Sequence, residues 1–258
     1  MELQKEIWIN SVTEGLYADN TFAARSINHS DFVNDKTVHV PNAGAGPNVE
    51  KDRATLPATI AVRADNDLKY DIHEFTSDPI RIPHAETVEL SYNKRESVVR
   101  VSRATLIDKV HKDLVASWIT GAGTITPGAT VKETVRKTKL QMDKDLVPST
   151  GRNFMLTAEK YNQLLDELGD AAQNNFLVSA DPARGILGKW MGFDFYMHEL
   201  DGTQNGLAWW DQAVSRALGE VVMFEQEKSP EYFSDIISFL VRAGGAAIRK
   251  DAKGLLTF

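Results

Sequence analysis

The chain has 258 residues, enough for one large domain or two modest ones, and its 42% hydrophobic and 25% charged residues are ordinary for a soluble protein with a buried core. It contains no cysteine, so disulfides, thiolate zinc sites and cysteine nucleophiles are excluded. The formal net charge of -7 argues against a domain whose main task is to grip nucleic acid, although it is compatible with a shell that faces nucleic acid without holding it tightly.

Neither membrane insertion nor export is expected. No apolar run approaches the length of a membrane span. The first ten residues, MELQKEIWIN, are polar and have no hydrophobic signal core, so we expect no export by the usual route. Without disulfides, stability must come from packing or from assembly with other chains.

The first 34 residues combine a helical stripe with an arm. Residues 2–16 carry a loose helical stripe of apolar side chains that ends near Gly15. After it, Phe22, Ile27 and Phe32 are scattered among polar residues, a pattern typical of an extended arm. Isolated large apolar groups need another surface to cover them, so an arm implies contact with another chain. An ordinary N-terminal helix and loop is the alternative.

A long β excursion is predicted next. Residues 37–40 form a short strand that Pro41 ends or moves to a sheet edge. The GAG triplet at 44–46 is a weak likeness of a phosphate loop, because no helix start follows it. Farther on, apolar and polar residues alternate as in half-covered strands; the apolar ones are Leu68, Tyr70, Ile72, Ile80, Ile82, Val88, Leu90 and Tyr92.

Prolines limit where these strands can lie. Pro57, Pro79 and Pro83 keep them out of the middle of a sheet. About fifty residues therefore form edge-like strands with little core of their own. Open edges invite pairing, so this region favours self-association over catalysis.

A long helix follows from about Lys94 to Ile119. Its apolar stripe recurs every four residues, at Leu106, Val110, Leu114 and Trp118. At 1.5 Å per residue the helix is roughly 40 Å long, which suggests a structural spine.

The second half predicts interspersed helices and strands. Thr130–Glu133 matches a capping box and opens a helix that stops at Pro148. Strands are predicted at 151–157, 174–179, 185–200 and 220–227, and helices at 158–168 and 208–219, the latter capped by Asp211. The tail predicts a strand, a bend at Gly244–Gly245 and a second short strand. Without a strict βαβ repeat, the fold class is mixed α+β.

The sequence offers no catalytic constellation. The six histidines lack metal-ligand spacing, and neither a nucleophile elbow nor a Walker loop is present. An acidic cluster at Asp65, Asp67, Asp71 and Glu74 lacks the order of a calcium loop and fits a solvated turn better. We therefore predict no catalytic residue, cofactor or metal, and no enzyme.

The order of the pieces resembles the tailed-bacteriophage major capsid proteins with the Hong Kong 97-type fold. The likeness spans nearly the whole chain. ADNTFAARSINHSDFVNDKTVHVPNAGAGP is similar to the family's N-terminal arm leading into an extended loop, and LKYDIHEFTSDPIRIPHAETVELSYNKRESV to the loop's return. The most specific stretch, with its Val-Pro-x-x-Gly-Arg turn, is VKETVRKTKLQMDKDLVPSTGRNFMLTAEKYNQLL. GILGKWMGFDFYMHEL carries Ile-x-Gly-x-x-x-Gly-Phe, and AWWDQAVSRALGEVVMFE and DIISFLVRAGG resemble later segments.

The resemblance implies a domain map. Residues 1–34 would be the N-terminal arm and 35–88 the extended loop. Residues 89–120 and 228–258 would form a peripheral domain with the spine helix, and 121–227 an axial domain that converges on capsomer axes.

The resemblance also implies a structural role. One chain would self-assemble as hexamers and pentamers into an icosahedral phage head around double-stranded DNA, in the virion, after assembly in the host cytoplasm. Expected partners are other copies, portal, scaffolding or decoration proteins, and weakly the packaged DNA. Together with the pattern of edge strands, the resemblance predicts inter-subunit interface residues: Phe22, Phe32, Leu68, Tyr70, Ile72, Ile80 and Ile82. The alternative is an encapsulin-like nanocompartment shell enclosing cargo enzymes.

Overall fold

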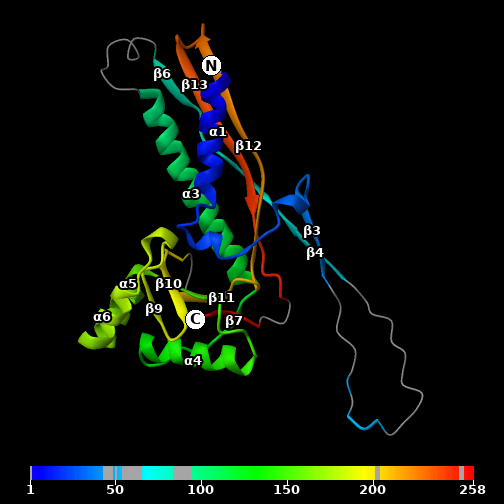
Figure 1. Ribbon diagram of the computed structural model, residues 1–258. Coiled ribbons are helices and arrows are strands. Elements are labelled where there is room, and N and C mark those ends of the chain that lie inside the picture. Colours follow the sequence, from blue (N-terminus) through cyan, green and yellow to red (C-terminus); the bar gives the residue numbers. More distant parts are fainter. Residues whose placement is uncertain are drawn as a thin grey trace.

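The computed structural model describes residues 2–42, 49, 51–53, 66–83, 94–200, 204–249 and 253–258 (Figure 1). The predicted GAG turn, the segment around Pro57, Asp65 and the strand at Val88–Tyr92 lie outside these residues. The described part mixes helices and sheets without a βαβ repeat, which confirms the α+β class.

Two helices lie side by side along a long β-ribbon. Helix α1 (Glu2–Leu16) packs on α3 (Lys94–Thr120), the predicted spine. The four stripe residues of α3 are all buried. The upper two, Leu106 and Val110, share a core with α1 and the ribbon, while Leu114 and Trp118 belong to the next core along. The spine helix therefore connects two packing units.

The ribbon consists of β12 (Ser215–Ser229) and β13 (Ser234–Gly244), paired antiparallel. It is the centre of a five-stranded sheet in the order β1 (Ile27–Asn28), β12, β13, β5 (His73–Thr76), with β6 (Ile80–Pro83) pairing farther along β13. Two of the predicted edge strands are thus paired within their own chain. They remain at the sheet edge, where Pro79 and Pro83 are tolerated.

The second unit is a six-stranded sheet near the C-terminal end of α3. Its order is β7 (Gly123–Thr124), β14 (Leu255–Thr257), β11 (Gly206–Trp210), β8 (Arg152–Leu156), β10 (Phe193–Met197), β9 (Gly188–Trp190). Alternate residues face opposite sides. Phe154 and Phe195 lie in a core with α4 (Val131–Lys144), α5 (Ala158–Leu168) and α6 (Asp170–Val178), whereas Met155 and Tyr196 face Trp118 of the spine helix. Strand β8 is buried along its whole length.

A third, small sheet projects from the body. It contains β2 (Val33–Asn34), β3 (Thr37–Asn42) and β4 (Asn66–Asp71), and in Figure 1 the β3–β4 pair points away from both units. Strand β2 pairs only with Val38 and Thr37, so at Pro41 strand β3 has β4 as its one described neighbour. Pro41 therefore sits at an edge position inside a strand, rather than ending it.

Two predicted elements are wrong in type. Residues 208–219 are not a helix: they end β11, turn at Asp211 and begin β12. Asp211 accepts a hydrogen bond from Asn153 Nδ2 at 2.6 Å, and its N–H donates to the Gly151 carbonyl at 3.0 Å, so it holds a turn. Residues 174–179 are not a strand, because α6 runs through them to Val178. Short apolar runs fit both structures, and here tertiary packing of Phe176 decides for the helix.

The sheets also cross the predicted domain boundary at residue 227. Strand β14 lies in the six-stranded sheet, although residues 228–258 were assigned with the spine helix. Most of β12, predicted as axial, pairs instead with β13 in the ribbon. Only the last strand of the chain returns to the six-stranded sheet, which ties the two units together.

Candidate assembly surfaces

Phe22 lies inside its own protomer. It is 5% exposed, and its ring contacts His111 and His198, each at a centroid distance of 5.1 Å, and Trp118 at 6.0 Å. These partners come from the spine helix and from the end of β10, far away in sequence. A neighbouring chain is therefore not needed to cover Phe22, and no local pattern could have indicated this.

Three more predicted interface residues are also buried within the chain. Ile82 packs between the spine helix and the ribbon, Ile72 packs on Val38, and Leu68 is covered as well. Their alternation with polar residues reports a covered face correctly, but the cover is intramolecular. Interface roles for these three positions stay predictions.

The remaining predicted positions are more open. Phe32 is 49% exposed, and Tyr70 and Ile80 are half-buried. The Tyr70 hydroxyl lies 3.4 Å from His29 Nδ1. Ile80 borders a hollow of about 540 Å³ between β5 and the spine helix, together with Val101 and Leu106. Phe32 and this hollow are surfaces that a second chain can reach.

The tip of the β12–β13 ribbon carries an apolar knob that the sequence pattern did not single out. Tyr232 and Phe233 are exposed, Phe233 at 80%. Phe233 and Lys228 both have a φ of +49°, a left-handed conformation that side chains rarely adopt. The Phe233 N–H donates to the Ser229 carbonyl at 2.8 Å, which holds the turn. A strained turn that displays an aromatic ring is a candidate contact surface.

A charged cluster fastens this ribbon to the start of the spine helix. Arg95 forms ion pairs with Glu225, with Glu227 at 3.7 Å and with Asp235 at 4.0 Å. Its guanidinium also lies 5.2 Å from the ring centroid of Trp8 in α1. One cation thus connects α1, α3 and both ribbon strands, so the ribbon that ends in the knob is held firmly against the two helices.

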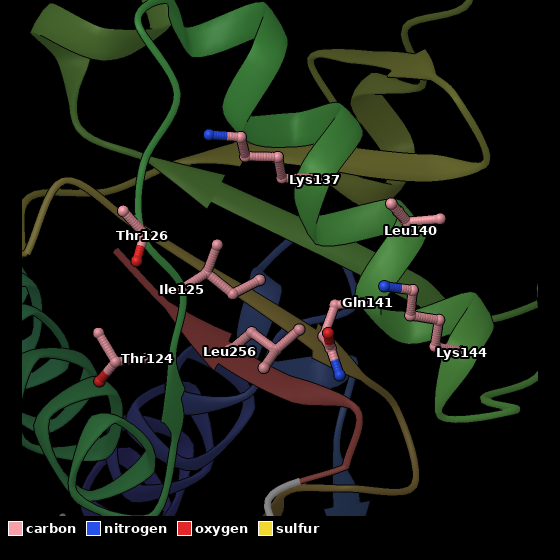
Figure 2. Close-up of a pocket in the computed structure, with 8 residues that line it drawn as sticks. All are labelled: Thr124, Ile125, Thr126, Lys137, Leu140, Gln141, Lys144 and Leu256. Atoms are coloured by element: carbon pink, nitrogen blue, oxygen red, sulfur yellow. The ribbon is translucent and has the colours of Figure 1, made fainter.

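A second hollow lies at the β7–β14 edge of the six-stranded sheet. Its volume is about 540 Å³, and it lies between α4 and the β7–β14 edge, where it is open to solvent. Figure 2 shows Ile125, Leu256 and Gln141 near its centre, with Lys137, Leu140 and Lys144 along the helix. Leu140 is 56% exposed although it lies in a helix interior. An apolar floor with lysines around it is suited to an apolar group that carries negative charge beside it.

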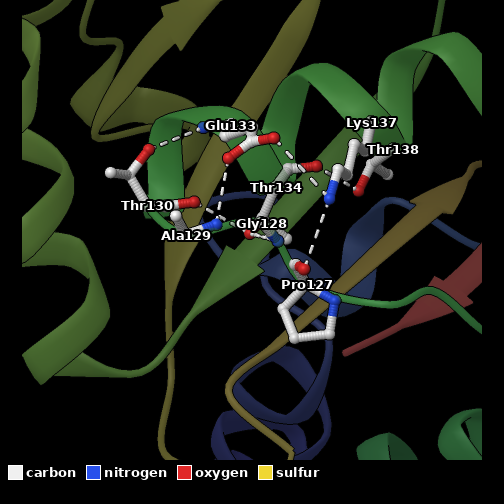
Figure 3. A network of polar contacts seen from close by, with 8 residues as sticks. All are labelled: Pro127, Gly128, Ala129, Thr130, Glu133, Thr134, Lys137 and Thr138. Atoms are coloured by element: carbon white, nitrogen blue, oxygen red, sulfur yellow. Dashed lines mark hydrogen bonds and ion pairs between the residues drawn. The ribbon is translucent and has the colours of Figure 1, made fainter.

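The start of α4 is fixed by a polar network (Figure 3). Thr130 Oγ1 accepts from the Glu133 N–H at 3.1 Å, as the predicted capping box requires, but Glu133 reaches back to the N–H of Ala129 rather than of Thr130. Glu167 from α5 accepts from the N–H groups of Val131 and Lys132. Lys137 donates to the Pro127 carbonyl at 3.4 Å. The helix and the loop beside the hollow are therefore held in a fixed relative position.

The titratable groups with shifted pKa values are structural. Burial lowers the pKa of His111, whose Nε2 donates to the Leu16 carbonyl at 2.7 Å. Burial raises the pKa of Asp211 and lowers that of Arg216, which donates to the Ala23 and Ser26 carbonyls. Burial also raises the pKa of Tyr17, whose hydroxyl donates to the Ala217 carbonyl. None of these groups lines the two hollows. The shifts of His111, Arg216 and Tyr17 reflect locking of the N-terminal segment onto the body, and that of Asp211 reflects the turn that it holds.

Within the described ranges, no three His, Asp or Glu side chains gather as metal ligands would. No helix there has the length and apolar character needed to span a bilayer.

Comparison with family models and with curated proteins finds no match. Among solved structures, the chain is similar to one from Mycobacterium phage Che8, with a TM-score of 0.69, 19% identity and coverage of 92% of this chain and 90% of that one. It is similar to the capsid structure of the cyanophage P-SCSP1u, with a TM-score of 0.65, 13% identity and coverage of 90% and 85%. A virus-like particle from Pyrococcus furiosus matches with a TM-score of 0.65, 9% identity and 99% coverage of both chains. The chain therefore has the Hong Kong 97-type fold of tailed-phage major capsid proteins over nearly its whole length.

Proposed function

We propose that the chain is the structural subunit of an icosahedral shell, the major capsid protein of a tailed-phage head. The observation that carries this proposal is the match to capsid chains along about nine-tenths of their length and of this chain. Because the fold likeness covers nearly all of both chains, it supports the same role, that of a shell subunit. In this proposal the chain is a building unit and not an enzyme.

Surface features of the chain support assembly. The β3–β4 pair projects from the body and shares only a small core with Ala217 of β12, the ribbon presents Tyr232 and Phe233, and two hollows of about 540 Å³ remain open. Exposed apolar groups of this kind are typical of surfaces that other chains cover. In the proposed shell, copies form hexamers and pentamers around double-stranded DNA, with the six-stranded sheet unit near the capsomer axes.

The remaining expectations belong to the same proposal. The arm and the extended loop lie over neighbouring subunits, and portal, scaffolding or decoration proteins complete the head. The shell assembles in the host cytoplasm and then forms part of the virion. Contact with packaged DNA is weak and non-specific, as the net charge of -7 suggests.

An encapsulin-like nanocompartment is the second candidate. It is favoured by the virus-like particle from Pyrococcus furiosus, which this chain matches over 99% of both lengths. In this alternative the shell would enclose cargo enzymes rather than DNA.

Expression of the chain, alone and with its neighbouring genes, tests both candidates. Electron microscopy and light scattering should detect closed shells, sheets or rings with five- or six-fold symmetry. Nuclease-protected double-stranded DNA in purified shells supports the phage head, whereas an enclosed enzyme and no DNA supports the nanocompartment. A monodisperse monomer under all conditions would contradict the shell function itself.

A further inference from the structure

The six-stranded sheet unit has different surfaces at its two opposite edges. At the β7–β14 edge lies the hollow beside α4, bordered by Thr124 of β7 and Leu256 of β14. At the β9 edge lies α6, which contacts β9. The ring of Phe176 in α6 lies so close to Gly188 of β9 that a Cβ there would be 2.6 Å from it. Helices α4, α5 and α6 follow one another from the first edge to the second, each contacting the next.

The two edges have opposite charge. Helix α4 contains five basic residues and two acidic ones, in a chain whose net charge is -7. Its two acids are already paired, Glu133 with Lys137, and Asp143 with Lys139 and Arg152. Arg136 and Lys144 are exposed and form no ion pair with the described residues. The outer surface of α4 therefore has positive charge that its own protomer does not neutralise.

The opposite holds for α5 and α6. Residues 158–178 contain four acidic residues and a single basic one. Glu167 is used within the protomer, where it caps α4. Glu159, Asp166 and Asp170 are exposed and have no ion pair among the described residues.

Each edge also has apolar groups without cover. At the end of α6, Leu177 and Val178 are exposed, Val178 at 86%. At the other edge, Leu140 stands beside the hollow with Ile125 and Leu256 in it (Figure 2). An apolar helix end on an acidic helix pair and an apolar hollow beside a basic helix are complementary in charge and in apolar character.

We propose that the α6 edge of one copy docks at the α4 hollow of the next copy, with Leu177 and Val178 in the hollow and the acidic α5–α6 surface facing Arg136 and Lys144. This contact rests on the proposed shell function and names the surfaces by which neighbours within a capsomer meet. Because the two surfaces differ and lie at opposite edges, the contact is head-to-tail, and a suitable rotation closes it into a ring. The charge pairs are at its rim, so the contact weakens as salt rises.

Charge reversal on one side, followed by reversal on both, tests this contact. Arg136→Glu with Lys144→Glu places like charges opposite each other, as does Asp166→Lys with Asp170→Lys. Each double variant should form about tenfold fewer rings and shells than the wild type at low salt, measured by sedimentation and electron microscopy. The quadruple variant carries both reversals and restores opposite charges, so its assembly should recover. Circular dichroism and urea unfolding establish that every variant is folded.

A matched control separates this pairing from overall charge. Lys5→Glu with Arg100→Glu makes the same change of net charge on α1 and the spine helix, at positions that border neither of the two hollows, and it must not be rescued by Asp166→Lys with Asp170→Lys. Recovery of the quadruple variant alone supports the contact. If the wild type assembles and both one-sided variants assemble equally well, or if the quadruple variant fails to recover, the contact is wrong and the shell function stands. If the wild type never assembles, the shell and the contact both fail.

Discussion

The six-stranded sheet unit and the β3–β4 projection lie at the two extremes of packing in this molecule. The first is covered on both faces, by α4 to α6 on one side and by the spine helix on the other. The second has a core of Val38, Ile72 and Ala217, with partly buried residues around it. The first region buries enough apolar surface to drive folding, whereas the second adds little to that total and leaves surface that another chain can contact. Substitutions that affect folding and assembly separately therefore test whether the two regions have these different roles.

The largest loss of subunit stability is expected from Phe154→Ala. Phe154 is fully buried in the six-stranded sheet, with ring centroids at 5.4 Å from Phe193, 5.3 Å from Phe195 and 5.8 Å from Phe258. Its removal leaves a cavity and should lower the free energy of unfolding by about 3–5 kcal/mol in urea titrations. Val38→Ala, at the base of the projection, is the control and should cost about 1–2 kcal/mol. Equal losses at the two sites would contradict the contrast.

A pH-dependent effect is expected at His111, which joins the spine helix to the end of α1. Burial lowers its pKa, His198 lowers it further, and the Leu16 carbonyl and Asp108 oppose the shift. Since the folded pKa lies below the unfolded one, the unfolded state binds more protons, and this stability is fully present above the ordinary histidine pKa of about 6.5. It is lost as the pH falls from there toward the lowered pKa.

Urea unfolding between pH 8 and pH 5 measures this effect. His111→Gln should remove part of the pH dependence because it removes the titrating group. Val110→Ala, at the neighbouring buried position of the spine helix, is the control, because it disturbs the packing without removing a titrating group and should leave the slope as in the wild type. An unchanged slope in His111→Gln would show that other groups cause the acid sensitivity.

A smaller effect is expected at the ribbon tip. Phe233 has a φ of +49°, which glycine adopts without strain, so Phe233→Gly should raise the free energy of unfolding by about 1 kcal/mol. The same change deletes the exposed ring and should reduce assembly. Tyr232→Ala removes a neighbouring ring without that backbone benefit and serves as the control. A destabilised Phe233→Gly subunit would mean that the ring packs within its own protomer.

Local patterns predicted the elements whose signals are local. The stripe on the spine helix and the hydrogen bond that Thr130 accepts from Glu133 depend on neighbouring residues, and both agree with the structure, although the Glu133 side chain reaches one residue farther back than the capping box predicts. The errors concern segments for which distant partners decide. Residues 208–210 form a strand because β8 and β14 flank them, and Phe22 is buried because four distant rings surround it. The exposed knob at Phe233 could have been found only as a large apolar residue beside a proline turn, which is a weak signal.

Shortening the β3–β4 projection should change the stability of the subunit least and its assembly most. Deletion of residues 54–80 would remove β4, β5 and the buried Ile72 and should unfold the subunit. The strand register indicates a shorter deletion. Asn42 of β3 and Asn66 of β4 are directly paired, so a two-residue Asn-Gly turn can replace residues 43–65.

The shortened subunit should unfold within about 1 kcal/mol of the wild type, since the described core residues remain in place, and yet it should form no closed shells. Urea titration measures the first property and electron microscopy the second. Insertion of Gly-Ser between Ser149 and Thr150, in the exposed turn between α4 and β8, is a control that alters a loop without shortening the projection. Closed shells from the shortened chain would show that neighbours do not depend on the projection, and the contact surfaces would then have to lie on the two packed units alone.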